Sequence, residues 1–340
     1  MIGFSIYPDD QRDLYKVFLK MKEIGFKSIF TSSHIPEIND KKRLFEIIDL
    51  SRKFNMDIVL DVDNNSIIDF LDDQFKDLIF RMDYGISYKD MANFSKDRKI
   101  SLNASTIREN DLLELKKYKA NFKNIVAIHN FYPRVDTGLS YSYFRKQNEI
   151  LRKYKIKIGA FSSGDKCFRK PMFKGLVTIE DFRYKNTFVQ VLIFLLKEEM
   201  DYVFISDPDF YDYDLFKIFK EGLIPIPIKV FDQDKLISSY TFKNRRDHAK
   251  NVIRCEGSRS LFNNVNPFNT VYRKKGSITM DNYLNKRYEG ELQIILSDLK
   301  AQNQINVVAE VEDKYLDLLD LIVDERSFKF YERDRKKKYK

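Results

Sequence analysis

The sequence contains little cysteine and little histidine. Its 340 residues include two cysteines and three histidines. Cys167 and Cys255 lie far apart without a CxxC spacing, so neither a disulfide framework nor a zinc site is indicated. The histidines show no HxH or HExxH spacing, and we therefore predict no metal ligands.

Long apolar runs are also missing. No stretch approaches the length that a membrane span needs. Met1 leads directly into a strand-like run at residues 2–7, without the basic, apolar and small-residue regions of a secretion signal. We expect a cytoplasmic protein with no membrane partner.

The charge is high but does not exclude a core, because 33% of the residues are charged, 43% are hydrophobic and 14% are aromatic. The net charge is +9, and the basic tail at residues 331–340 supplies +4 of it. We expect this tail to be solvated. The remaining excess suits an anionic small substrate better than nucleic acid, which usually requires basic residues clustered on one face.

Strands and amphipathic helices alternate from the start of the chain to residue 222. Apolar residues at helical spacing, such as Leu14, Val17, Phe18 and Met21, separate the strands. Eight parallel βα units close into a TIM-type barrel, so we predict an α/β fold with a catalytic barrel at residues 1–222. The predicted strands are residues 3–7, 28–32, 57–63, 78–83, 99–105, 126–132, 157–163 and 202–207.

Two other folds are compatible with parts of this pattern. An open doubly wound sheet would also alternate strands and helices, but no GxGxxG follows the first strand. An antiparallel sheet with one wet face would show the same alternation of side chains within strands, although the intervening helices make it hard to build.

The side chains within the strands alternate between apolar and polar. Phe80 and Met82 share one face of the fourth strand, and Arg81 and Asp83 share the other. The third and fifth strands show the same pattern. We expect the apolar face to pack against the helices and the polar face to point to the barrel axis, with its charges gathered at the carboxyl end.

After residue 222 the pattern changes. Residues 224–230 contain two prolines in an apolar run, which indicates a domain boundary or an edge strand. Strand-like runs follow at residues 239–242, 291–297 and 306–310, with a short helix near residues 315–322. We predict a smaller, mainly β domain at residues 223–330.

The most informative stretch is residues 128–134, where an apolar run ends in His129, Asn130, Tyr132 and Arg134. Adjacent residues of a strand face opposite ways, so His129 and Asn130 both reach a ligand only if the strand ends between them. A histidine here is also compatible with a satisfied core position. Asn103 and Asn130 are suited to bind sugar hydroxyl or acetamido groups.

Several acids are candidates for glycosidic cleavage, which needs one carboxyl group as proton donor and another ionised. Asp61, Asp83 and Asp207 end strands on the inward face, and Glu37 follows the second strand. Arg81 lies two residues before Asp83 and should hold it ionised, so Glu37 is the better acid. Alternatively, Arg81 and Asp83 form a pair that plugs the barrel, and Glu37 is simply exposed.

Two further regions are candidates for binding an anionic group. Residues 175–183, with Thr178, Glu180 and Arg183, follow the seventh strand, and this part of a barrel often binds phosphate. Thr178 could instead be a helix cap. In the second domain the candidates are Arg254, Arg259 and the run Arg273-Lys274-Lys275-Gly276, for which a solvated basic face is the alternative.

Taken together, these segments resemble the MupG-like 6-phospho-N-acetylmuramidases, a glycosidase family formerly labelled as uncharacterised or outer surface proteins. The resemblance spans nearly the whole chain. Its motifs are Phe30-Thr31-Ser32-Ser33-His34-Ile35-Pro36-Glu37, Arg81-Met82-Asp83-Tyr84-Gly85, Leu102-Asn103-Ala104-Ser105, residues 129–134 with Thr137-Gly138-Leu139, residues 175–183, residues 273–282 and Gly290-Glu291-Leu292-Gln293-Ile294.

The resemblance implies a TIM-type barrel followed by a cyclophilin-like β domain. It also implies hydrolysis of N-acetylmuramic acid 6-phosphate–N-acetylglucosamine in cytoplasmic peptidoglycan recycling, without a cofactor. We expect the catalytic residues to be Glu37, Asp83 and Asp61. The substrate-binding residues that we predict are His34, Arg81, Asn103, His129, Asn130, Tyr132, Arg134, Thr178, Glu180, Arg183, Asp207, Arg273 and Lys275.

Two other functions stay open at this point. One is a barrel lyase or isomerase that acts on another sugar phosphate with His129 as base. The other is a non-catalytic protein whose β domain and basic tail bind an acidic partner. Association of the chain into a homo-oligomer is compatible with each of the three.

Overall fold

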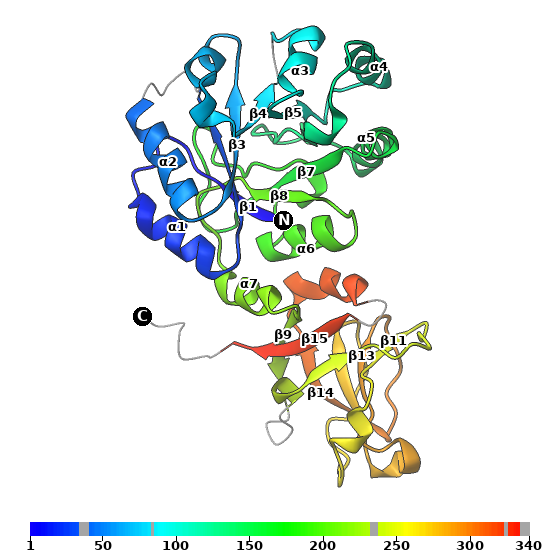
Figure 1. Cartoon of the computed structure of the whole chain (residues 1–340). Coiled ribbons are helices and arrows are strands. Elements are labelled where there is room, and N and C mark those ends of the chain that lie inside the picture. The colour runs from blue at the N-terminus through cyan, green and yellow to red at the C-terminus, as the bar shows by residue number, and fades with distance from the viewer. Residues whose placement is uncertain (34–40, 83–84, 232–236, 323–325, 334–340) are drawn as a thin grey trace. The chain divides into compact units, whose positions relative to one another are not determined.

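The computed structural model describes residues 1–33, 41–82, 85–231, 237–322 and 326–333. They divide into two compact units, Met1–Tyr213 and Asp214–Lys340, and we describe each by itself (Figure 1). The division falls at the start of α7 (Tyr213–Lys220). The predicted boundary after residue 222 lies shortly beyond the end of this helix.

The first unit contains a closed barrel of eight parallel strands, as predicted. The last strand pairs with the first through Gly3 and Phe204, so the sheet has no open edge. The doubly wound and antiparallel alternatives are therefore wrong. The strands are β1 (Ile2–Ser5), β2 (Ser28–Ser32), β3 (Asp57–Val62), β4 (Ile79–Met82), β5 (Lys99–Asn103), β6 (Ile125–Ile128), β7 (Lys157–Ser162) and β8 (Tyr202–Ile205).

Helices connect most of these strands and surround the barrel (Figure 1). They are α1 (Leu14–Glu23), α2 (Lys41–Lys53), α3 (Tyr88–Phe94), α4 (Glu109–Lys117), α5 (Tyr141–Lys153) and α6 (Thr187–Leu196), and α7 follows β8. The first begins where the Asp13 side chain accepts a hydrogen bond from the Lys16 N–H, and its predicted apolar stripe is buried. Two 3₁₀ turns, Ser66–Phe70 and Asp73–Phe75, stand between β3 and β4 instead of a longer helix.

The barrel interior is filled by large apolar side chains. Phe30, Phe161 and Phe204 meet inside it, and the rings of Phe30 and Phe161 pack edge to face with centroids 4.9 Å apart. Gly3 makes room for this aromatic cluster, because a Cβ atom at that position would lie 2.7 Å from the Phe204 ring. Val59 and Ile79 belong to the same cluster, so the residues two positions later, Asp61 and Arg81, continue the inward face towards the carboxyl end.

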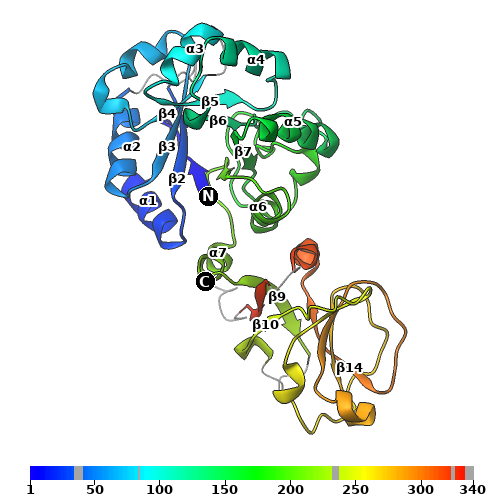
Figure 2. The same cartoon turned by 45° about the vertical axis from the view of Figure 1, so that its right-hand side comes forward.

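The second unit contains a seven-stranded mixed sheet in the order β10-β15-β9-β14-β12-β13-β11. Figure 2 labels β9, β10 and β14 of this sheet. Its strands are β9 (Ile224–Val230), β10 (Thr241–Lys243), β11 (Val252–Arg254), β12 (Ser277–Asp281), β13 (Leu292–Ile295), β14 (Ile305–Val311) and β15 (Ser327–Glu332). The Arg245 N–H donates to the Arg254 carbonyl at 3.0 Å, and the Glu256 N–H donates to the Lys243 carbonyl at 2.9 Å. The two edges of the sheet therefore meet just beyond β10 and β11.

The proline-containing strand β9 lies inside this sheet, so of the two alternatives given for its prolines, a domain boundary or an edge strand, the edge strand is wrong. Its first part pairs with β15 and its last part pairs with β14, and the Pro227 carbonyl accepts the Glu312 N–H just beyond β14. The missing N–H groups of Pro225 and Pro227 therefore point away from β15, and neither proline removes a hydrogen bond from that pairing.

The remaining predictions for this unit need smaller changes. The short helix is a 3₁₀ segment, Asp313–Leu321, and β15 extends into the predicted basic tail. Among the helices in the described part of the chain, none is both long and apolar enough to cross a membrane.

Candidate active site

Three polar side chains meet at the carboxyl end of the barrel. Asp61 and Arg81 are paired neighbours on β3 and β4, and an Arg81 Nη1 donates to Asp61 Oδ1 at 2.8 Å. The other guanidinium nitrogen donates to the amide oxygen of Asn130, just beyond β6. Arg81 is only 5% exposed, so a buried cation joins a carboxylate and an amide from three parts of the barrel.

Neighbouring strand ends support this cluster. Ser32, the last residue of β2, donates from its hydroxyl group to Asp61 Oδ2 at 3.4 Å. Asn103, the last residue of β5, accepts the Ser105 N–H at 3.0 Å. The Ser105 hydroxyl oxygen in turn accepts the Asn130 N–H at 2.9 Å, so Ser105 links Asn103 to the backbone of Asn130.

His129 does not point into this site. The strand ends at Ile128, but the alternation of side chains continues, and the imidazole is fully buried between the barrel and α5. Its Nε2–H donates to Asn148 Oδ1 at 2.8 Å, and its Nδ1 lies 3.2 Å from the Ser105 hydroxyl group. The prediction that it binds substrate is therefore not supported by its position; His129 instead orients Ser105.

The electrostatics of His129 agree with this position. Burial lowers its pKa to about 4, although the hydrogen bond with Asn148 acts in the opposite direction. The ring is therefore neutral at pH 7. Its Nδ1 accepts the Ser105 hydroxyl hydrogen, which leaves the hydroxyl oxygen to receive the Asn130 N–H.

Thr178 fixes the backbone carbonyl of Asn130. Its hydroxyl group donates to the Asn130 carbonyl at 2.9 Å and accepts the Phe161 N–H at 2.9 Å, and the side chain is fully buried. It is neither a helix cap nor exposed to a ligand. The Tyr132 N–H donates to the Val177 carbonyl at 2.9 Å, which extends the same connection between the segments after β6 and β7.

Glu180 and Arg183 tie these two segments together. Arg183 contacts both carboxylate oxygens of Glu180, at 2.5 and 2.6 Å, and it also donates to the carbonyls of Tyr132, Arg134 and Gly175. The N–H groups of Asp136 and Gly138 donate to Glu180 as well. Hydrogen bonds from Arg183 chiefly lower the pKa of Glu180, to about 2.

Asp207 has a similar role after β8. It accepts the backbone N–H groups of Gly164, Arg169 and Leu176 at 2.9 to 3.0 Å. Burial nevertheless raises the pKa of its carboxyl group above the ordinary value. Glu180, Arg183 and Asp207 thus fix the loops of the rim, whereas Arg134 is exposed there.

Two residues of this rim were missing from the sequence prediction. Tyr7 continues the inward face of β1 beyond Gly3 and Ser5, and the Arg169 guanidinium lies over its ring at 3.6 Å from the centroid. Arg169 also forms an ion pair with Asp9 at 3.1 Å. The alternation in β1 could have indicated Tyr7, but nothing in the long loop after β7 indicates Arg169.

Three predicted site residues, His34, Glu37 and Asp83, lie outside the described residues. Two of the three predicted catalytic carboxylates are therefore not placed. In the part of the chain that is described, no group of three or more histidine, cysteine, aspartate or glutamate side chains could hold a metal ion.

Arg273 and Lys275 belong to the second unit. The Arg273 guanidinium is buried and donates to the Lys300 carbonyl at 2.7 and 3.0 Å, and the Lys275 N–H donates to Asp298 at 2.8 Å. Arg273 is thus held within its own domain. Nearby, Asp281 is buried, and its Oδ1 has no hydrogen-bond partner among the described residues.

Comparisons with known proteins cover almost the whole chain. Family models described as 6-phospho-N-acetylmuramidase, N-terminal, and 6-phospho-N-acetylmuramidase, C-terminal, match residues 2–219 and 227–331. No curated protein matches the chain.

Two solved structures resemble it along nearly their full length. A conserved Enterococcus faecalis protein of unknown function is 29% identical, with a TM-score of 0.88 over 98% of this chain and 96% of the other. An uncharacterised B. cereus protein is 24% identical, with a TM-score of 0.78 over 97% and 99%, and this likeness shows the fold alone.

The buried state of His129 predicts a pH-dependent stability. Its folded pKa lies below its ordinary value, so the unfolded chain binds more protons, and stability is lost as the pH falls from 6.5 to 4. We expect His129 to account for about 3 kcal/mol of that loss. The free energy of unfolding in urea, measured from pH 6.5 to 4, should not show this loss in His129→Gln. His248→Gln, which changes an exposed histidine, should show the same loss as the wild type. Equal pH dependence of all three proteins would contradict the prediction.

Asp281 predicts a pH dependence of the opposite sign. Burial and the nearby Glu291 raise its pKa to about 6, so the folded state binds more protons and stability falls as the pH rises from 4 to 6. Asp281→Asn should remove this dependence and gain about 2 kcal/mol over the wild type at pH 7. Chemical unfolding of the second unit at both pH values tests this, with the exposed Asp320→Asn as control. A loss of stability in Asp281→Asn at pH 7 would refute it.

Proposed function

The chain belongs to the 6-phospho-N-acetylmuramidase family, and we propose that it is a glycoside hydrolase that cleaves N-acetylmuramic acid 6-phosphate–N-acetylglucosamine. Two family models, one for each part of the chain, support this proposal. The substrate is then a phosphorylated amino-sugar disaccharide, which agrees with the moderate positive charge of the chain.

The observation that carries the proposal is the cluster of Asp61, Arg81 and Asn130 at the carboxyl end of the closed barrel. Enzymes with this fold keep their active sites at that end. Glycosidic cleavage builds up positive charge at the anomeric carbon. A fixed carboxylate such as Asp61 can stabilise that charge, attack the carbon or activate water.

The proposed mechanism needs a second carboxyl group to protonate the bridging oxygen. We assign this role to Glu37, which follows β2, and we assign Asp83 or Asp61 to the anomeric carbon. The guanidinium group of Arg81 holds the Asp61 carboxylate at 2.8 Å, which fixes its position for the role at the anomeric carbon.

Asn130 and Asn103 are the proposed contacts for the sugar. The amide oxygen of Asn130 is occupied by Arg81, so its NH2 group is the part that can donate to a carbonyl or hydroxyl oxygen of a ligand. The backbone of Asn130 is fixed from two sides by Ser105 and Thr178. This amide is therefore oriented before a substrate binds, which favours recognition of an acetamido group.

The setting that we propose is cytoplasmic recycling of peptidoglycan, without a cofactor. The two rival functions receive less support. A lyase or isomerase with His129 as base would need an accessible imidazole, but this ring is fully buried. A non-catalytic role of the basic tail depends mainly on residues 334–340, which lie outside the described residues.

Removal of the Asp61 charge tests the proposal. We expect the purified protein to release N-acetylglucosamine from the phosphorylated disaccharide, and Asp61→Asn to lower kcat by about a hundredfold or more, because the developing positive charge loses its partner. Asp73→Asn removes an exposed carboxylate of an ion pair with Lys76 and should keep full activity. Absence of release by the wild type, or equal rates in both variants, would refute the proposal.

Arg81 allows a sharper test of the cluster. Its planar fork contacts Asp61 and Asn130 at once, and a lysine ammonium group cannot reproduce both contacts. Arg81→Lys should therefore lower kcat. In the double variant with Asp61→Asn, the rise in activation free energy should be far smaller than the sum of the rises in the two single variants, since the residues act as one unit. Additive losses would show that the two side chains act independently.

A further inference from the structure

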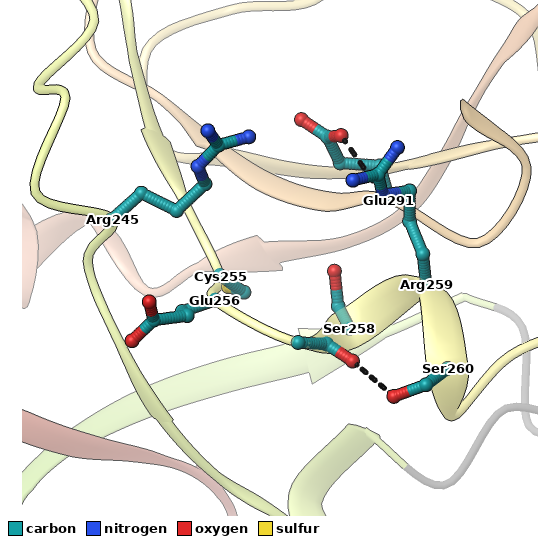
Figure 3. A pocket seen from close by; sticks show the side chains of 8 residues that line it. Arg245, Cys255, Glu256, Ser258, Arg259, Ser260 and Glu291 are labelled. Carbon is teal, nitrogen blue, oxygen red and sulfur yellow. Dashed lines mark hydrogen bonds and ion pairs between the residues drawn. The ribbon is translucent and has the colours of Figure 1, made fainter. Parts of the chain in front are cut away.

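The second unit contains a cavity of about 380 Å³ where the two edges of its sheet meet (Figure 3). Its walls come from Arg245 after β10, from the segment 255–260 after β11, and from Glu291 before β13. Ligand sites for small molecules start at about 300 Å³. The cavity therefore has room for a molecule of the size of a monosaccharide.

Three arginines and two carboxylates form a continuous chain of charges beside this cavity. Glu291 accepts Arg254 Nε at 2.7 Å and lies 3.7 Å from Arg259. Arg254 also approaches Asp247 at 3.4 Å, and Asp247 pairs with Arg245 at 2.9 Å. Burial acts to raise the pKa of Glu291, but the Arg254 hydrogen bond and charge hold it below its ordinary value, so the carboxylate is ionised.

Two of these three arginines, Arg245 and Arg259, face the cavity. Figure 3 shows Arg245 on one side and Arg259 on the other, with Ser258 and Ser260 below Arg259. Their side chains are 34% and 46% exposed, whereas Glu291 is buried at 5%. The guanidinium groups can therefore reach a bound anion, and the buried carboxylate keeps the neighbouring Arg254 in place.

The other lining groups indicate more than a simple anion site. Glu256 also lines the cavity, and a carboxylate repels an inorganic anion but accepts hydrogen bonds from hydroxyl groups. The Ser258 oxygen accepts the Leu292 N–H, so its hydroxyl hydrogen is available to a ligand. The lining thus matches a molecule that carries both an anionic group and several hydroxyl groups.

We propose that this cavity binds a sugar phosphate, whose phosphate group lies between Arg245 and Arg259 and whose hydroxyl groups contact Glu256 and Ser258. The site is built only from residues of the second unit. None of these residues belongs to the candidate active site in the barrel, and the proposal does not depend on the hydrolase activity. The basic run at Arg273 and Lys274 does not contribute, because Arg273 is held by the Lys300 carbonyl and Lys274 by Glu310 at 3.0 Å.

Calorimetric titration of the full chain with glucose 6-phosphate, glucose and inorganic phosphate tests the proposal. We expect glucose 6-phosphate to bind more tightly than either of the others. Arg259→Gln and Arg245→Gln should each weaken its binding by about tenfold or more, since each removes a charge-assisted hydrogen bond. Arg246→Gln, an exposed neighbour that does not line the cavity, is the matched control and should bind as the wild type does.

The same titrations in an Arg81→Met background separate this site from the barrel, because binding to the cavity should persist there. The side chains of both tested arginines are partly exposed, so the variants should fold, and one folded variant suffices for the test. Unchanged binding in Arg259→Gln or Arg245→Gln, loss of binding in Arg81→Met, or no binding at millimolar concentration would overturn the proposal. Binding of inorganic phosphate as tight as that of glucose 6-phosphate would overturn the assignment to a sugar.

Discussion

The candidate active site depends on how the buried charge of Arg81 is neutralised. A guanidinium group that is almost withdrawn from water is unstable without partners that match its charge and its hydrogen bonds. Asp61 supplies the charge, and Asn130 supplies a second acceptor. The position of Asn130 is in turn fixed by Ser105 and Thr178, so this residue links Arg81 to the segments after β5 and β7.

The fold of the first unit was predictable because it follows from local sequence patterns, namely the alternation of side chains within strands and the helical spacing of apolar residues between them. Alternation along β3 and β4 placed Asp61 and Arg81 on the inner face, and the closed barrel then brought them together. The direction in which the His129 side chain points was harder to predict from the sequence. The strand ends at Ile128, earlier than the predicted residue 132, yet the alternation of side chains continues for another residue. The partner Asn148 lies on a helix whose packing no local pattern reveals.

Other features depend on contacts between distant segments. Glu180 and Arg183 are three residues apart and could have been predicted to pair, but their contacts with the carbonyls after β6 could not. Prolines in β9 indicated an edge, whereas the strand is paired on different sides along its length. In the second unit, the sequence could not distinguish the buried Arg273 from Arg245 and Arg259, which face a cavity.

The aromatic cluster of Phe30, Phe161 and Phe204 closes the barrel beneath the polar residues. Such a floor leaves no passage through the barrel axis, so molecules enter and leave by one opening.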